Sequence, residues 1–188
     1  MAGIYKAYDI RGIYPSEINE TIARQAGQAF RAVLDDEDFA HGGDKVVVSR
    51  DMRPSSGPLA AALVEGLTAA GLDVLDIGLS TTSMNYFAIG RLGTAGGVQV
   101  TASHNPAQYN GLKFSRHEAR PVSGDHGIQK LARMIQPAGC MAQFQHGLAD
   151  SKYILSRHQP AEEQVALIGH DRAQLGGAGI RAGFNEGQ

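Results

Sequence analysis

Short apolar runs alternate with segments of helical periodicity through the middle of the chain. This pattern predicts buried strands at 45–49, 73–78 and 96–101, and helices at 56–70 and 82–92. Two parallel strands need a connection about as long as these helices, so the alternation predicts two successive βαβ units. The chain is therefore expected to have an α/β fold, with its ligand-binding loops at the carboxyl ends of the parallel strands.

Further predicted elements flank these two units. Apolar residues recur at helical spacing over 19–34, and another helix is expected over 124–135. Asn110 and Gly111 form a pair typical of tight turns, and residues 112–115 after them are expected to form a short strand, antiparallel because the connection is too short for a crossover. Together the elements predict a three-layer α/β/α domain around a mixed, mostly parallel, four-stranded sheet.

The composition changes after Pro137, which suggests a boundary. We expect one domain over residues 1–136 and an irregular linker or tail over 137–188, in which residues 139–188 hold 8 Gly and 6 Gln but only short apolar runs. Two interpretations of the tail stay open. It is either the product of a frameshifted or truncated gene, or a native segment that folds separately or contacts a partner.

Composition excludes several classes of function. The 17 Lys and Arg residues against 19 Asp and Glu give a net charge of −2, without the basic excess of a general nucleic-acid binder. The sequence has no apolar run of about 20 residues, so no membrane span is expected. A single cysteine, Cys140, excludes an internal disulfide framework and fits a reducing compartment, so a cytoplasmic location is expected.

Ser103 is the candidate nucleophile, because it follows a predicted strand and has polar and titratable neighbours. A hydrolase of the nucleophile-elbow type needs glycine two residues before and two residues after its serine, where this chain has Thr101 and Asn105. Serine hydrolysis is therefore disfavoured. Local chemistry alone leaves two alternatives open: Ser103 is a nucleophile, or Ser103 and Asn105 only cap a loop by hydrogen-bonding its backbone.

Three ordered segments resemble the α-D-phosphohexomutases, the phosphomannomutase and phosphoglucomutase family. TASHNP at 101–106 with YNGLK at 109–113 is similar to the family's active-serine loop. YDIRG at 8–12 is similar to its amino-terminal loop, and SRDMRPSS at 49–56 to the loop after its first parallel strand. The resemblance covers about residues 4–136 and implies the first of the four domains that such enzymes normally have.

The resemblance implies a phosphoryl transfer that interconverts hexose 1-phosphates and 6-phosphates. In this mechanism phosphorylated Ser103 donates its phosphoryl group to a sugar monophosphate, and the serine reclaims the other phosphate from the resulting bisphosphate. The implied substrates are glucose or mannose phosphates, with hexose 1,6-bisphosphate as activator and Mg²⁺ bound to an oxygen of the phosphoserine. Such a transfer needs positioning and positive charge more than covalent assistance.

The resemblance also assigns expected roles to residues of this sequence. The expected catalytic residues are Ser103, Arg11, Lys113 and His104. Substrate-loop or phosphate-loop roles are expected for Tyr8, Asp9, Asn105, Asn110 and Arg50. Arg53 is expected to be solvated. These roles come from the resemblance, because spacing alone does not distinguish them.

The family's later motifs do not occur in this sequence. The aspartate loop that holds the metal in the family is absent, so Ser103, through its phosphate, is the only expected metal contact and the Mg²⁺ site is incomplete. The isolated chain is therefore expected to be inactive without the missing mutase domains or an unknown protein partner. The alternative function is a non-catalytic remnant that binds phosphate or a partner.

Overall fold

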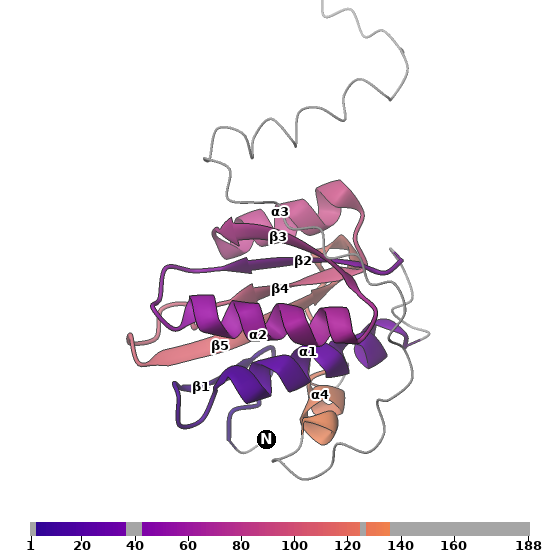
Figure 1. Cartoon of the computed structure of the whole chain (residues 1–188). Coiled ribbons are helices and arrows are strands. Elements are labelled where there is room, and N and C mark those ends of the chain that lie inside the picture. The colour runs from indigo at the N-terminus through magenta and orange to yellow at the C-terminus, as the bar shows by residue number, and fades with distance from the viewer. Residues whose placement is uncertain (1–2, 37–42, 125–126, 136–188) are drawn as a thin grey trace, which may run out of the picture. The chain divides into compact units, whose positions relative to one another are not determined.

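A mixed five-stranded sheet organises the computed structural model, which describes residues 3–36, 43–124 and 127–135 (Figure 1). The strand order is β1-β5-β4-β2-β3. In chain order the strands are β1 (Ile10–Ile13), β2 (Lys45–Arg50), β3 (Asp73–Leu79), β4 (Gly96–Val100) and β5 (Tyr109–Arg116). β2 is parallel to β3 and β4, whereas β5 is antiparallel to both β4 and β1. The expected α/β fold is confirmed.

Helices cover both faces of the sheet, which confirms the three-layer arrangement (Figure 1). The helices are α1 (Glu20–Leu34), α2 (Ser56–Ala69), α3 (Thr82–Leu92) and α4 (Ile128–Met134), with a 3-10 turn η1 at His117–Ala119. α1 and α2 pack together over one face, where Phe30 and Phe114 meet with ring centroids 5.0 Å apart. On the other face Ile89 of α3 packs on Val47 of β2.

Local chemistry explains where the helices begin and how closely they pack. Asn19 caps α1 by accepting a hydrogen bond from the Ile22 N–H at 3.1 Å, and the Thr81 hydroxyl caps α3. Gly66 lets α2 cross close to α1, because a Cβ atom there would lie only 2.0 Å from the Arg24 carbonyl oxygen. The predicted helices 19–34, 56–70 and 82–92 are confirmed to within one residue at each end. The predicted helix 124–135 is shorter, because α4 spans only Ile128–Met134 in the described part of the chain.

The expected four-stranded, mostly parallel sheet needs correction. The sheet has five strands, and its pairings divide equally into parallel and antiparallel ones. The missed strand, β1, has four residues, and two of them are only partly buried. A strand that short, on the edge of a sheet, shows too little periodicity to be recognised from sequence alone.

The expected turn at Asn110 and Gly111 is also wrong. Both residues lie inside β5, where they pair with Gly12 and Arg11 of β1. The Asn110 side chain is fully buried, and its Nδ2 donates to the hydroxyls of Ser55 and Ser56 at 2.8 and 3.0 Å. Gly111 is needed for close packing, because a Cβ there would lie 2.6 Å from the Ile10 carbonyl oxygen.

The predictions for residues 137–188 lie outside the described residues. Within the described part of the chain, no helix combines the length and the apolar character that a membrane crossing requires.

Candidate active site

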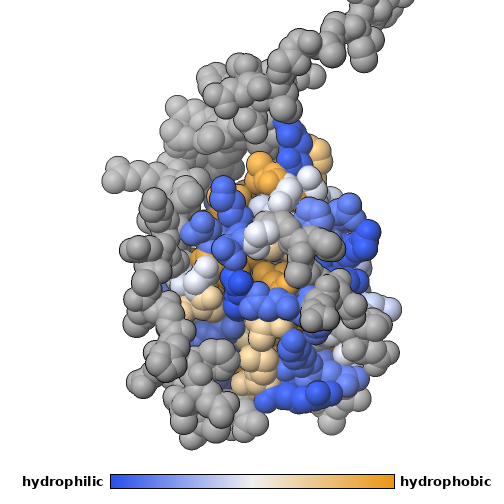
Figure 2. Space-filling model, turned by 90° about the vertical axis from the view of Figure 1, so that its right-hand side faces the viewer, coloured by the Kyte–Doolittle hydropathy of each residue, from blue (hydrophilic) through white to orange (hydrophobic). Residues whose placement is uncertain are grey.

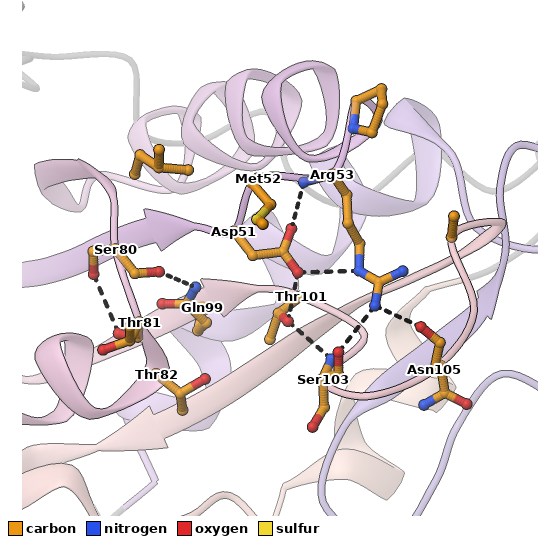
Figure 3. Close-up of a pocket in the computed structure, with 13 residues that line it drawn as sticks. Asp51, Met52, Arg53, Ser80, Thr81, Thr82, Gln99, Thr101, Ser103 and Asn105 are labelled. Atoms are coloured by element: carbon orange, nitrogen blue, oxygen red, sulfur yellow. Dashed lines mark hydrogen bonds and ion pairs between the residues drawn. The ribbon is translucent and has the colours of Figure 1, made fainter.

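The loop between β4 and β5, residues 101–108, carries Ser103 and is called the serine loop below. It meets the loops that follow β2 and β3, because the three parallel strands end at the same edge of the sheet. An open pocket of about 820 Å³ lies among these loops. Its lining includes Asp51, Arg53, Ser80, Gln99, Thr101, Ser103 and Asn105, which come from all three loops and from β4 (Figure 3).

Ser103 is exposed and has an unusual backbone conformation. Its φ angle is 55°, in the left-handed region that residues other than glycine seldom adopt. Its N–H donates to the Thr101 hydroxyl at 2.9 Å, and its Oγ lies 3.3 Å from Nδ1 of His104. The serine hydroxyl is therefore open to solvent and has an imidazole nitrogen beside it.

Asp51 sits beneath the serine loop and accepts several hydrogen bonds. The hydroxyls of Ser56 and Thr101 donate to it at 2.5 and 2.7 Å, and the backbone N–H of Arg53 at 3.1 Å. Burial by itself would raise the pKa of Asp51. The hydrogen bonds from Ser56, Thr101 and the Arg53 N–H, together with the charge of Arg53, outweigh it and lower this pKa below its ordinary value. The carboxylate is thus held ionised.

The expectation that Arg53 is solvated is wrong. Its side chain is only 13% exposed and lies against the serine loop (Figure 3). Its Nη2 donates to the carbonyl oxygens of Ser103 and Asn105 at 2.9 and 2.7 Å. Its Nη1 donates to the carbonyl oxygens of Pro106 and Tyr109 at 2.8 and 3.1 Å. Sequence analysis missed this role, and no local signal could have found it, since the contacts join residues about 50 positions apart.

Arg11 and Lys113 share one face of the sheet but do not line the pocket. Arg11 pairs with Gly111 across the β1–β5 ladder, and Lys113 pairs with Gln99 across the β5–β4 ladder. Side chains opposite one another in these ladders point to the same face. Arg11, Lys113 and Gln99 therefore point to the side on which α3 packs, next to the pocket that Gln99 lines.

The other expected site residues are spread around this edge of the sheet. Asp9 is buried and forms an ion pair with Arg11, whose buried Nε has no partner among the described residues. Tyr8 is 57% exposed. Arg50 ends β2, and its carbonyl oxygen accepts a hydrogen bond from the Ser80 N–H at 2.9 Å. Of the expected site residues, only Ser103 and Asn105 line the pocket.

A buried polar chain supports the pocket wall opposite the serine loop. The Asn85 amide donates to the Ser49 hydroxyl at 2.7 Å, Ser49 donates to the Gln99 amide oxygen, and Gln99 donates to the Ser80 carbonyl oxygen at 3.2 Å. Sequence analysis missed this chain. Its signal is a polar residue directly next to buried apolar ones in a strand, as Ser49 follows three valines and Gln99 lies between two.

Apolar side chains border the same pocket. Met52 and Leu79, both in its lining, are 83% and 63% exposed. Figure 2 shows one face of the molecule, on which hydrophobic patches lie between hydrophilic ones. The rim of this pocket therefore carries two large apolar side chains that the described part of the chain leaves exposed.

The described residues do not fit a magnesium site by themselves. No group of three His, Cys, Asp or Glu side chains within 3–36, 43–124 and 127–135 could hold a metal ion. The carboxylate that lines the pocket, Asp51, already accepts hydrogen bonds from Arg53, Ser56 and Thr101. A divalent cation here would need ligands beyond these side chains.

Comparison with known proteins identifies relatives of this chain. The family described as "Phosphoglucomutase/phosphomannomutase, alpha/beta/alpha domain I" matches residues 3–138. A phosphomannomutase of Klebsiella pneumoniae is 48% identical over 132 residues, which cover 70% of this chain and 80% of that protein. The Escherichia coli K12 phosphomannomutase is 47% identical over 132 residues, but the match spans only 27% of its length.

A solved structure agrees with these sequence matches. The crystal structure of a phosphoglucomutase/phosphomannomutase family protein from Burkholderia thailandensis is 40% identical, with a TM-score of 0.62. The match covers 70% of this chain and 29% of that one. The family match over residues 3–138 includes the strands and loops that build the pocket, and the chain therefore belongs to the phosphoglucomutase/phosphomannomutase family, of which it carries domain I.

Proposed function

We propose that this chain is the phosphoserine-bearing domain of a phosphohexomutase, in which Ser103 accepts and returns a phosphoryl group. The observation that supports this most is the position of Ser103. This residue is exposed, lines a pocket and lies in a loop with a left-handed backbone conformation. Membership of the family supports the same assignment. The parent activity is the interconversion of hexose 1-phosphate and hexose 6-phosphate through a bisphosphate.

The proposed transfer has a simple balance of bonds. The Ser103 oxygen forms a bond to phosphorus, and the ester bond between that phosphorus and the sugar oxygen breaks. The sugar oxygen takes up a proton, and Ser103 loses one. His104 would receive that proton, and the 3.3 Å distance between its Nδ1 and the serine oxygen supports this role. Arg11 and Lys113 would offset negative charge on the moving phosphoryl group.

The substrates we propose are glucose and mannose phosphates, with hexose 1,6-bisphosphate as activator. Magnesium belongs to the proposed function of the parent enzyme, where it would neutralise phosphate charge. Because the described residues do not form its site, no step of this proposal is assigned to the metal. The proposed domain covers residues 1–136, and residues 137–188 would form a separate segment.

A turnover assay and a discharge assay test this function together. The chain is incubated with glucose 1-phosphate or mannose 1-phosphate, Mg²⁺ and a catalytic amount of hexose 1,6-bisphosphate, beside Ser103→Ala. Separately, the phosphorylated chain is mixed with glucose 6-phosphate and assayed for bisphosphate. We expect discharge to bisphosphate from the wild type only, and little steady turnover, because the match spans 27% of the length of the E. coli relative.

Steady turnover that is lost in Ser103→Ala would show that one domain suffices. A folded chain that neither takes up nor returns phosphate would contradict the proposal. It would favour the second candidate, a non-catalytic remnant that binds phosphate or a partner. The exposed Met52 and Leu79 side chains beside the pocket are the observation that favours this candidate.

A further inference from the structure

The conformation of Ser103 requires something to hold it. A left-handed φ of 55° at a residue with a Cβ atom costs free energy, and such conformations persist where neighbouring contacts determine them. Ser103 is also exposed, so core packing does not supply that constraint. The constraint has to come from hydrogen bonds to the backbone of the serine loop.

Both peptide groups that flank the Ser103 Cα are tied to the loop after β2. On one side the Ser103 N–H donates to the Thr101 hydroxyl at 2.9 Å, and Thr101 donates to Asp51 at 2.7 Å. On the other side the Ser103 carbonyl oxygen accepts from Arg53 at 2.9 Å. Asp51 and Arg53 also bind one another, with Nε and a carboxylate oxygen 3.1 Å apart. Both sets of hydrogen bonds therefore lead to the ion pair of Asp51 and Arg53.

The guanidinium of Arg53 has no donor left for a ligand. Arginine has five N–H donors. Five contacts use them: the Asp51 carboxylate and the carbonyl oxygens of Ser103, Asn105, Pro106 and Tyr109. A phosphate would have to displace a carbonyl oxygen to reach this side chain. The contacts favour a role in shaping the serine loop over a role in binding phosphate.

We propose that Arg53 is a positioning residue, which holds Ser103 in its left-handed conformation through the serine-loop carbonyl oxygens and does not bind phosphate. The catalytic meaning of this role rests on the proposed function, whereas the effect on the loop does not. Lysine cannot replace arginine here, because its three donors on one nitrogen cannot reach four divergent carbonyl oxygens and a carboxylate at once. A role as a positive charge alone would tolerate lysine.

The test compares Arg53→Lys with wild type and with the control Arg24→Lys, which alters an exposed arginine paired with Glu65. Amide hydrogen exchange is followed for Ser103, Asn105 and Tyr109, whose N–H groups donate to acceptors in the serine loop. Exchange in β2 and β4 reports whether the fold is intact. The rate of Ser103 phosphorylation by hexose 1,6-bisphosphate is measured over a range of bisphosphate concentrations.

For Arg53→Lys we expect at least a tenfold loss of protection in the serine loop, with protection in β2 and β4 within twofold of wild type. The maximal rate of phosphorylation should fall at least tenfold, while the half-saturating bisphosphate concentration changes less than threefold. A phosphate-binding arginine would instead raise that concentration. Arg24→Lys should match wild type in every measurement.

A double variant tests the backbone strain directly. Glycine adopts a left-handed φ at little cost, so Arg53→Lys combined with Ser103→Gly should recover most of the Asn105 and Tyr109 protection that Arg53→Lys loses. Two results for Arg53→Lys would overturn the proposal. One is protection from amide exchange in the serine loop that stays within twofold of wild type, and the other is an equal loss of protection in the serine loop and in β2 and β4. If the wild-type chain is not phosphorylated, the proposed function fails and the exchange data alone decide the role of Arg53.

Discussion

The Arg53 Nη2 atom donates a 2.9 Å hydrogen bond to the carbonyl oxygen of Ser103, 50 positions later in the chain. This bond joins the loop after β2 to the loop after β4, and β2 and β4 are neighbouring parallel strands. The parallel pairing brings the two loops to one edge, and the guanidinium then fixes their relative position. The candidate nucleophile is therefore held by residues of a different βαβ unit from its own strand.

Ser103→Gly should stabilise the chain. The left-handed φ of Ser103 is strained for serine but open to glycine, and the expected gain in the free energy of unfolding is about 1 kcal/mol. Ser103→Ala is the matched control, because alanine keeps the strain and removes the same hydroxyl. Urea denaturation measures both. Equal stabilities for the two variants would show that Ser103 is not strained.

Asp51 should make the stability of the chain depend on pH in the acid range. Its pKa is lower in the folded chain than in the unfolded chain, so the folded state binds fewer protons there. The stability from Asp51 is present above about pH 4 and is lost as the pH falls through the folded-state pKa. Urea denaturation between pH 3 and 7 should show a steeper acid loss for wild type than for Asp51→Asn. Parallel curves for the two proteins would contradict this prediction.

Gly66→Ala should destabilise the packing of α2 against α1. The added Cβ would lie 2.0 Å from a backbone oxygen of α1, which cannot move aside as a flexible side chain can. The expected loss in the free energy of unfolding is about 3 kcal/mol. Gly90→Ala in α3, where nothing lies within 4 Å, is the control and should gain about 0.5–1 kcal/mol. Thermal denaturation measures the stability of both variants. A similar change in stability for Gly66→Ala and Gly90→Ala would contradict this prediction.

Lys113→Met should slow the phosphorylation of Ser103 without unfolding the chain. Lys113 points to the same sheet face as Gln99 in the pocket lining, and loss of a cation near the transferred group costs about 10²–10³-fold in rate. Lys130→Met, which removes a lysine paired with Asp36 on the surface, serves as the control. Quenched time courses with hexose 1,6-bisphosphate give both rates. Phosphorylation of Lys113→Met at the wild-type rate would show that Lys113 has no part in the phosphorylation of Ser103.

The helices and the parallel strands could be predicted because each helix has apolar residues at helical spacing and each parallel strand is a short apolar run. The ends predicted for 82–92 coincide with those of α3, where Thr81 caps the start and Gly93 the end with a φ of 60°. The signal at Asn110 and Gly111 was misleading. This pair favours a turn by local preference but is buried in β5. Asn110 donates hydrogen bonds to Ser55, which precedes α2, and to Ser56, the first residue of α2. Gly111 lets β1 approach closely.

The candidate site could be located from sequence only in part. The apolar run before Ser103 predicted that this residue lies on a loop after a buried strand, and the structure places it there. The proposed role of Ser103 came from the motif resemblance. The role of Arg53 could not be predicted, because it depends on four carbonyl oxygens, from the serine loop and the first residue of β5, that only the folded chain brings together. For the chain from Asn85 to Ser80, the sequence offers polar residues next to apolar ones in two strands, but their pairing joins three elements of structure and is set only by the fold.

The most direct test of the central claim is the mass of the chain after reaction with hexose 1,6-bisphosphate and Mg²⁺, followed by mapping of the modified peptide. The account predicts one added phosphoryl group, located on Ser103 and absent from Ser103→Ala. A folded wild-type chain that gains no phosphoryl group, or gains it at another residue, would contradict the account.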